Sequence, residues 1–262
     1  SYQACGKNVW AWIHRWMLRR IVKKLATNCT EMFTITKTEG KETDECFGTK
    51  SIVLTKGIDY SKRTFDGRAP HTPIRMVYTG NLLIGRATSL CAISRALKEI
   101  NKDGVKVTFD IYTPTVLDGA STKLLNSNGC TKHAFVPKEQ VADIQKNADI
   151  VVFVESLEKD HKYDARLSFS TKLTDYFASG KCIFAIGDKA IAPIQYLEEY
   201  DCAITCSNYG DVEGQLRKLI DNPTKITEYG RKAFDTGRLN HEESKVKDTF
   251  VLTLCKAAQQ KR

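Results

Sequence analysis

One short stretch, LSFSTKLTDYFASGKCIFAIG (residues 167–187), combines a helix start, a lysine and a following apolar run. Ser170 is of a type that commonly precedes helices and Gly180 of a type that ends them, which predicts a short helix beginning at Thr171. The first amides of a helix lack intrahelical partners and attract anions. Lys172 lies in that first turn, although the helix dipole disfavours a cation there. A lysine in this place indicates a phosphate ligand.

An acidic side chain follows one turn later on the same side of this predicted helix. Asp175 lies four residues after Thr171, and a carboxylate accepts hydrogen bonds from both hydroxyl groups of a ribose. Neighbouring sites for phosphate and ribose predict nucleotide binding. The alternative is that Lys172 and Asp175 form a solvated pair on an exposed helix face.

A second candidate phosphate site is the stretch YTGNLLIGRATSL (residues 78–90), where Gly80 ends an apolar run and Gly85 precedes a helix-like run. Glycines let the backbone approach a ligand, a helix start attracts phosphate, and Arg86 adds a charged fork of donors. The stretch matches neither the dinucleotide-binding glycine pattern nor the P-loop pattern. A plain strand–turn–helix with a surface arginine is the alternative.

The elements that would position these residues alternate between apolar strand-like runs and helix-like segments. Such alternation predicts an α/β fold with a parallel, Rossmann-like sheet covered by helices on both faces. Ligands bind such sheets at the carboxyl ends of the strands, where both candidate stretches lie. The strands are expected at 74–80, 105–113, 132–136, 148–156, 181–187 and 202–206, and the helices at 88–101, 138–147, 171–179, 190–199 and 210–221.

The residues before this alternation form a partial α/β segment of their own. Residues 9–25 (VWAWIHRWMLRRIVKKL) have an apolar stripe at helical spacing, flanked by arginines and lysines, which predicts an amphipathic helix. A strand, a polar helix over 38–47 and a second strand are expected to follow. Prolines, a glycine and several charges give residues 61–73 the composition of a linker. The predicted organisation is a first segment 1–62, a linker 63–73, a main domain 74–236 and a terminal segment 237–262 with one helix over 239–260, packing back toward the first segment.

Composition narrows the functional classes. The 262 residues carry a net charge of +9, and the first 70 residues contribute +6 of it (13 Lys/Arg minus 7 Asp/Glu). This bias favours an anionic partner, although a basic face on an ordinary globular protein is the alternative. No run approaches the roughly 20 apolar residues of a membrane span, and no signal peptide is visible. Nine cysteines without a C-x-x-C pair predict a reduced, cytoplasmic protein in which Cys91 and Cys182 lie in the core.

Three stretches resemble the nucleotide-binding half of the GT-B glycosyltransferases, especially the family-4-like enzymes of bacterial polysaccharide and capsule assembly. YTGNLLIGR resembles their glycine loop, FVPKEQVADIQKNADIVVFVES their passage beside the base, and STKLTDYFASGKCIFAIG their S-K-x-x-E-Y-x-A-x-G-K-P signature. The resemblance extends over residues 30–235. It implies a GT-B carboxy-terminal domain, preceded in residues 1–62 by the end of the acceptor-side amino-terminal domain.

The resemblance also implies roles for individual residues. It assigns the donor diphosphate to Gly80, Asn81 and Arg86 together with Lys172 and the amides of Ser170 and Thr171, the ribose to Asp175, and the base to Glu139 and the backbone of Val136.

Two departures from the family pattern affect the expected chemistry. Asp175 replaces the usual glutamate and has a shorter reach. The family's earlier acid, which helps to hold the donor sugar in retaining members, falls on Leu167, so the stereochemical outcome is not readable and the catalytic residue stays unknown. Glu155, just after a strand, is a candidate substitute, although an ordinary surface glutamate is the expectation. The five histidines have no evident partners, so surface or linker positions are expected for them.

These features predict a glycosyltransferase that transfers a sugar from a UDP-linked donor to a glycan or lipid-linked acceptor. No Asp-x-Asp pair occurs, so we expect no metal or other cofactor and a diphosphate neutralised by Arg86 and Lys172. Nucleic acid is not an expected partner. The helix over 9–25 either packs within the amino-terminal domain or binds an anionic membrane at its cytoplasmic face.

Two other functions stay open at this point. The family's enzymes have a larger amino-terminal domain, so the chain resembles a part of one and is expected to be inactive alone if that part is missing. It is then a non-catalytic nucleotide-sugar-binding module. A sugar-nucleotide epimerase of the same fold is the third alternative.

Overall fold

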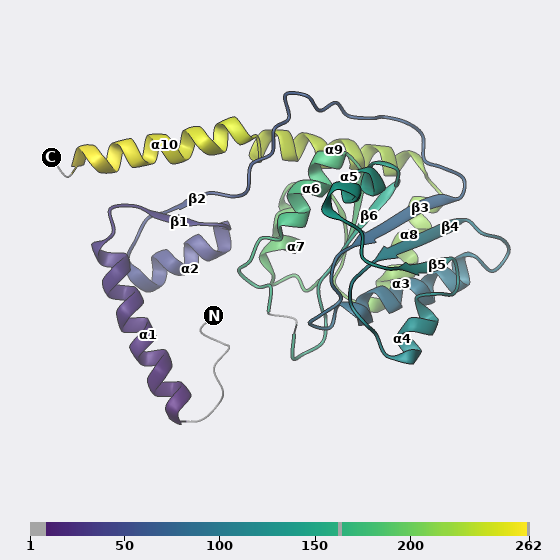
Figure 1. The fold of residues 1–262 in the computed structure, drawn as a ribbon, viewed down its shortest axis with the longest axis horizontal. Coiled ribbons are helices and arrows are strands. Elements are labelled where there is room, and N and C mark those ends of the chain that lie inside the picture. Colours follow the sequence, from purple (N-terminus) through teal and green to yellow (C-terminus); the bar gives the residue numbers. More distant parts are fainter. Residues whose placement is uncertain (1–8, 162–163, 261–262) are drawn as a thin grey trace. The chain divides into compact units, whose positions relative to one another are not determined.

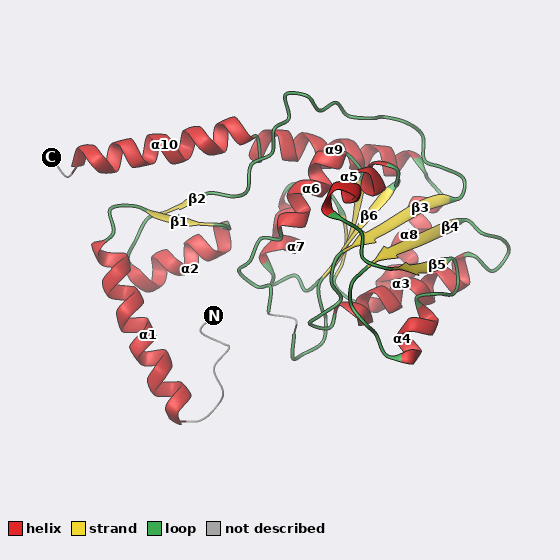
Figure 2. Cartoon of the chain, in the orientation of Figure 1, coloured by secondary structure: helices red, strands yellow, loops and turns green. Residues whose placement is uncertain are grey.

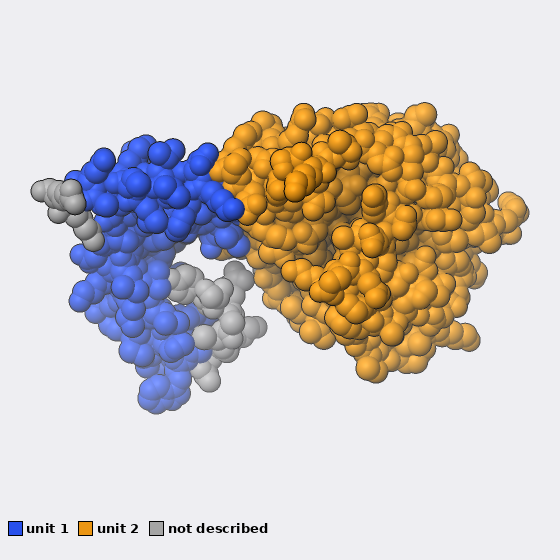
Figure 3. Space-filling model, turned by 45° about the horizontal axis from the view of Figure 1, so that its top comes forward, with its two compact units in different colours: residues 1–55, 246–262 blue, residues 56–245 orange. Residues whose placement is uncertain are grey.

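The computed structural model describes residues 9–161 and 164–260. The chain divides into two compact units, one made of residues 1–55 and 246–262 and a larger one made of residues 56–245 (Figure 3). Each unit has its own helices and its own parallel strands, and each is described in turn.

The larger unit is built on a six-stranded sheet in the order β5-β4-β3-β6-β7-β8, in which every pair of neighbours is parallel (Figures 1 and 2). The strands carry branched and aromatic residues and are mostly buried, as is usual for a sheet covered on both faces. Their bounds are β3 Ile74–Thr79, β4 Val107–Tyr112, β5 Cys130–His133, β6 Ile150–Val154, β7 Cys182–Ile186 and β8 Ile204–Cys206.

Helices cover both faces of this sheet and enclose two apolar cores. One core joins α3 and α8 to the sheet, and the other joins α6, α7 and α9 to the opposite face. Cys91 and Cys182 are buried in these cores, as predicted. The helices are α3 Arg86–Ile100, α4 Gly119–Leu124, α5 Lys138–Lys146, α6 Thr171–Ser179, α7 Ala192–Glu199, α8 Val212–Ile220 and α9 Thr224–Asn240, with a 3-10 turn at Tyr209–Asp211 before α8.

The smaller unit pairs β1 (Met32–Thr34) with β2 (Ser51–Val53) in parallel. Helices α1 (Val9–Asn28) and α2 (Lys37–Phe47) belong to it, and α10 (Glu243–Gln260), which begins in the larger unit, contributes Phe250, whose ring lies 5.5 Å from that of Phe33. The apolar stripe of α1 is largely exposed. Across the described residues, no helix is both long enough and apolar enough to cross a bilayer.

The predicted order of elements is confirmed, with three differences. Strand β5 begins at Cys130 and ends at His133, earlier than the expected 132–136. Helices α4 and α9 were not predicted. The single helix expected over 239–260 is wrong, because α9 ends at Asn240 and α10 begins at Glu243, with His241 between them. His241 is 1% exposed, and burial lowers its pKa to about 4.

The expectation that the histidines have no partners is wrong for four of them. Each of these imidazoles lies within hydrogen-bonding distance of an oxygen atom that is distant in sequence or one turn away. The pairs are His71 with Asp149 (2.8 Å), His133 with Asp110 (2.6 Å), His161 with Asp164 (2.9 Å) and His241 with Tyr196 (3.0 Å).

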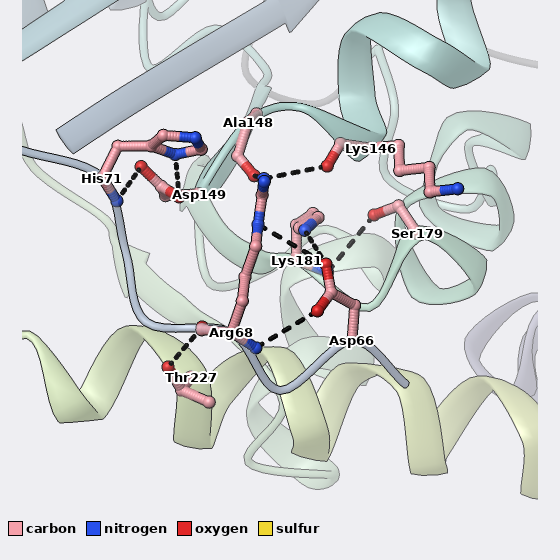
Figure 4. A network of polar contacts seen from close by, with 9 residues as sticks. All are labelled: Asp66, Arg68, His71, Lys146, Ala148, Asp149, Ser179, Lys181 and Thr227. Atoms are coloured by element: carbon pink, nitrogen blue, oxygen red, sulfur yellow. Dashed lines mark hydrogen bonds and ion pairs between the residues drawn. The ribbon is translucent and has the colours of Figure 1, made fainter. Parts of the chain in front are cut away.

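The irregular segment 61–73 is fastened to the amino-terminal edge of the sheet by charged contacts (Figure 4). The guanidinium of Arg68 donates to the carbonyl oxygens of Lys146 and Ala148 at 3.1 and 3.2 Å. The carboxylate of Asp66 lies 3.4 Å from Arg68 Nε and 3.7 Å from the ammonium of Lys181. Lys181 is 5% exposed, and burial lowers its pKa. These contacts fix the chain just before β3, β6 and β7 begin.

Helix α9 approaches α6 closely through two glycines. A Cβ added at Gly230 would lie 2.6 Å from the carbonyl oxygen of Gly180, the residue that ends α6 with a φ of 65°. A Cβ added at Gly237 would lie 2.6 Å from Cβ of Phe177 and overlap the hydroxyl of Tyr60. The position of α6 therefore depends on bare backbone in α9.

We predict that Gly230→Ala destabilises the protein although alanine is the better helix former. The carbonyl of Gly180 is backbone and cannot rotate away, so the free energy of unfolding should fall by roughly 1–3 kcal/mol. Gly214→Ala in α8 is the matched control, because a Cβ there meets nothing within 4 Å. That variant should gain about 0.5–1 kcal/mol. Urea unfolding of both variants checks this, and equal effects at the two glycines would contradict the packing role of α9.

Candidate functional site

Two glycines shape the loop that follows β3. Gly80 has a φ of 144° and Gly85 a φ of 71°, values that residues with a side chain rarely adopt. The amide of Gly80 donates to the carbonyl oxygen of Tyr112 at 2.9 Å, which ties the loop to the end of β4. Gly85 precedes the first residue of α3, Arg86. The predicted strand, glycine loop and helix start are therefore present.

The ammonium of Lys172 lies directly over the backbone of Gly80. A Cβ at position 80 would overlap Nζ of Lys172 and lie 2.7 Å from its Cε. The same ammonium lies 4.9 Å from the centre of the Tyr78 ring and donates to the Tyr78 hydroxyl at 3.4 Å. The two stretches that the sequence singled out, which are almost a hundred residues apart, thus meet at the carboxyl end of β3.

Helix α6 begins at Thr171, as predicted, and Ser170 occupies the position before it. In the described part of the chain, the Ser170 side chain makes no capping hydrogen bond, which corrects the expectation that it caps the helix. The first amides of α6, which have no intrahelical acceptor, are therefore not satisfied by that hydroxyl. These amides lie at the same end of α6 as Lys172, and they add a partial positive charge there.

The surroundings of Lys172 disfavour the charged form of its side chain. Burial and, to a smaller extent, the nearby charge of Arg86 lower its pKa to about 8, and the carboxylate of Glu155 acts in the opposite direction. The Tyr78 hydroxyl beneath it donates to the carbonyl oxygen of Asn81 at 2.6 Å, and burial raises the pKa of this phenol. Within the described residues this half-buried ammonium makes one long hydrogen bond, so it is short of acceptors, and an anionic ligand would supply them.

Arg86 is held in a bidentate ion pair with Glu155. Its Nε donates to Oε2 at 2.9 Å and its Nη2 donates to Oε1 at 3.0 Å, while Nη1 donates to the side-chain oxygen of Asn81 at 2.8 Å. Glu155 is 6% exposed, so the expectation of an ordinary surface glutamate is wrong. The pair holds the arginine, the asparagine and the end of β6 together.

The predicted ribose ligand, Asp175, lies on α6 and is accessible. Its carboxylate forms an ion pair of 2.7 Å with the ammonium of Lys56, and both side chains are nearly half exposed. Such an exposed pair contributes little to stability, so the carboxylate can exchange this partner for a ligand at small cost.

The two residues predicted beside the base lie at the start of α5. Val136 is half-buried in the loop between β5 and α5, and Glu139 is exposed in the first turn of that helix. The neighbouring Phe135 is 67% exposed. At the adjacent strand ends, Tyr112 and His133 stack with ring centres 4.5 Å apart. α5 packs against α6 and β3, which places this edge next to the lysine site.

Sequence reasoning missed Tyr78 and the partner of Arg86. Tyr78 is the only aromatic residue in β3, next to last in the strand, and its position before the glycine loop was a usable signal. Glu155 lies 69 residues from Arg86, and no local pattern joins them. Within the described residues, no group of three or more histidine, cysteine or acidic side chains is arranged to hold a metal ion.

No protein-family model and no curated protein sequence matches this chain. Solved structures, however, match its fold. TarM of S. aureus has a TM-score of 0.68 at 12% sequence identity over 89% of this chain. HepE of Anabaena, in complex with UDP-glucose, has a TM-score of 0.65 at 12% identity over 92% of it. WaaG, a glycosyltransferase involved in lipopolysaccharide biosynthesis, has a TM-score of 0.61 at 13% identity over 84%.

The chain spans 45% of the length of TarM, 61% of WaaG and 68% of HepE. These similarities establish that the chain has the GT-B glycosyltransferase fold, with its parallel sheet and surrounding helices. The fold predicted from the sequence is thereby confirmed.

We predict that the Lys172 ammonium titrates near pH 8, well below the usual range of a lysine. Because the charge of Arg86 disfavours a second cation, Arg86→Ala should raise this pKa toward the ordinary value of 10.5. NMR titration of protein labelled at the lysine ε-carbon measures it, with Lys172→Arg assigning the signal. A Lys172 that titrates at the ordinary value of a lysine would contradict the burial described here.

Proposed function

We propose that the protein binds a UDP-linked sugar at the carboxyl edge of its six-stranded sheet and transfers the sugar to a glycan or lipid-linked acceptor. The observation that carries this proposal is the ammonium of Lys172, placed over the bare backbone of Gly80 and short of acceptors. A diphosphate has the charge, the oxygens and the size to fill that position.

The diphosphate would be bound from both sides. On one side are the ammonium of Lys172 and the amides of Thr171 and Lys172, which as first-turn amides of α6 have no acceptor within the helix. On the other are the Gly80 loop, Asn81 and the outer edge of Arg86. As the bond between the anomeric carbon and the phosphate oxygen breaks, negative charge develops on the departing diphosphate. Preorganised cations and amides stabilise that charge more than they stabilise the bound donor, which lowers the barrier. On this proposal the cations take the part that a divalent metal plays elsewhere.

The remainder of the nucleotide would lie along α6 and α5. Asp175 would exchange Lys56 for the hydroxyl groups of the ribose. The base would lie beside Val136 and Glu139, with the exposed ring of Phe135 as a further neighbour. A uridine nucleotide is proposed because HepE, which shares the fold, was solved with UDP-glucose.

The acceptor hydroxyl must lose a proton during transfer, and its base is not assigned. Leu167 occupies the position where the related family carries an acid, and Glu155 is engaged by Arg86. Binding of the donor without transfer is therefore a second candidate function.

We predict that Lys172→Ala and Arg86→Ala each weaken UDP binding about ten- to a hundred-fold. Each loses charge-assisted hydrogen bonds to phosphate, which are worth roughly 1.5–3 kcal/mol. Isothermal titration calorimetry measures this, with Lys218→Ala in α8 as a control that removes the same charge from an exposed place. Unchanged UDP affinity in both site variants, with intact circular dichroism, would reject the site.

One further assay distinguishes the two candidate functions, which are transfer of the sugar and binding of the donor alone. Release of free UDP from UDP-glucose or UDP-N-acetylglucosamine that requires an added glycan or lipid-linked acceptor supports transfer. Binding without release supports the module.

We further propose that α1 binds anionic membrane, the alternative being that its apolar stripe packs on other protein. Trp10 and Trp12 are 78% and 63% exposed, and the guanidinium of Arg20 lies 4.3 Å from the Trp16 ring centre. Aromatic and basic side chains on one helix suit an interface with anionic lipid, where each basic residue contributes on the order of 1 kcal/mol.

Vesicles of phosphatidylglycerol and phosphatidylcholine are expected to bind the protein at low salt, and vesicles of phosphatidylcholine alone are not. Sedimentation measures this. Arg19→Glu with Lys23→Glu should abolish binding, whereas Lys98→Glu with Lys102→Glu on exposed parts of the larger unit should reduce it less. Equal losses in the two double variants, or no binding at low salt, would mean that α1 has no membrane role.

A further inference from the structure

Glu155 occupies a fixed place beside Arg86 in the candidate site. It follows β6 directly, and its amide donates to the carbonyl oxygen of Ile186 at 2.8 Å. Its own carbonyl oxygen accepts a hydrogen bond from the Ser89 hydroxyl at 2.8 Å, on the first turns of α3. The backbone that carries this carboxylate is thus held by β7 on one side and by α3 on the other.

The carboxylate determines which way the Arg86 guanidinium faces. A guanidinium has five N–H donors. Glu155 accepts one from Nε and one from Nη2, and Asn81 accepts one from Nη1, at 2.8 to 3.0 Å. One N–H on each of Nη1 and Nη2 is left by these three bonds, outside the side of the guanidinium that Glu155 occupies. Two remaining donors on neighbouring nitrogens suit a phosphate.

The burial of this pair makes the arrangement rigid. The side chains of Arg86 and Glu155 are 19% and 8% exposed, and an arginine on a flexible linker of three methylenes would otherwise adopt many rotamers. A surface arginine must lose that freedom when a ligand binds, whereas Arg86 has lost it already. Preorganisation of this kind increases affinity without any additional contact.

We propose that Glu155 is a positioning residue for the phosphate ligand: it holds Arg86 so that the two remaining N–H groups of the guanidinium face the diphosphate. This inference rests on the proposed function. It gives Glu155 no contact with the donor and no part in proton transfer. The opposing view is that the carboxylate competes with the diphosphate for Arg86 and repels it. The two views predict opposite changes in affinity when the carboxylate is altered.

A second glutamate in the same loop provides the matched control. Glu158 is exposed and accepts a hydrogen bond from the Thr88 hydroxyl at 2.7 Å, at the start of the same helix as Arg86. Glu158→Gln removes the same charge from the neighbourhood without touching the guanidinium. Glu155→Asp keeps the charge but shortens the reach by one methylene. These variants separate charge from position.

The experiment is calorimetric titration of the full chain with UDP and, separately, with inorganic pyrophosphate. Glu155→Gln and Glu155→Asp are each expected to weaken both ligands about tenfold, and Glu158→Gln to change them by less than about twofold. In an Arg86→Ala background, Glu155→Gln should have no further effect, because there is no guanidinium left to position. Wild-type affinity or tighter binding in Glu155→Gln would overturn the inference, as would an equal loss in the Arg86→Ala background.

The Arg86 Nε–H signal in nitrogen-15 NMR spectra gives a readout without nucleotide. A wild-type signal that is slow to exchange with water and is lost in Glu155→Gln supports positioning, and an unchanged signal in a folded variant overturns it. If the protein binds pyrophosphate but not UDP, and Glu155→Gln weakens pyrophosphate, the nucleotide-sugar function fails while the role of Glu155 stands. If wild-type protein binds UDP and Glu155→Gln binds it equally well, only the role of Glu155 fails. Binding of neither ligand overturns both.

Discussion

The candidate site depends on the close backbone contact between α6 and α9. Gly230 lies against the carbonyl of Gly180 at the end of α6, and Gly237 makes room for Phe177 in its middle. This contact fixes the position of α6 against the sheet. The amino end of α6 consequently brings Lys172 over Gly80, where a displacement of an ångström or two would separate the ammonium from the loop. The charged contacts of Lys181 hold the chain immediately after the same helix.

The charges at the amino end of α6 are balanced incompletely, and this imbalance gives the site its chemistry. Arg86 and Glu155 neutralise each other, whereas among the described residues the ammonium of Lys172 contacts the Tyr78 hydroxyl at 3.4 Å and the face of its ring. Burial and the charge of Arg86 together lower the pKa of Lys172 to about 8, although Glu155 acts in the opposite direction. The cost of burying this ammonium is offset when an anion with two or more acceptor oxygens binds to it. A diphosphate satisfies this demand, and it also suits the unpaired amides of the first helical turn.

The sequence alone predicted the parallel sheet, most of the helices and the two glycines of the β3 loop, because each has a local signature. The start and end of α6 followed from Ser170 and Gly180 in the same way. The sequence did not predict α9, because Gly230 and Gly237, which allow this helix to pack closely on α6, weaken its helical pattern. Nor did it predict the pair of Glu155 with Arg86 or the partners of the histidines. Those contacts join residues up to 78 positions apart, and only the folded topology brings them together.

A crystal structure of the protein with UDP tests the central claim, that the carboxyl edge of the six-stranded sheet is a diphosphate site. The diphosphate is expected within hydrogen-bonding distance of Lys172 Nζ, the amides of Thr171 and Lys172, and the outer edge of Arg86, with the ribose at Asp175. Density for UDP elsewhere would contradict it, for example in the groove lined by Phe65, Pro223 and Arg231 at the opposite edge of the sheet. An empty carboxyl edge at saturating UDP would contradict it equally.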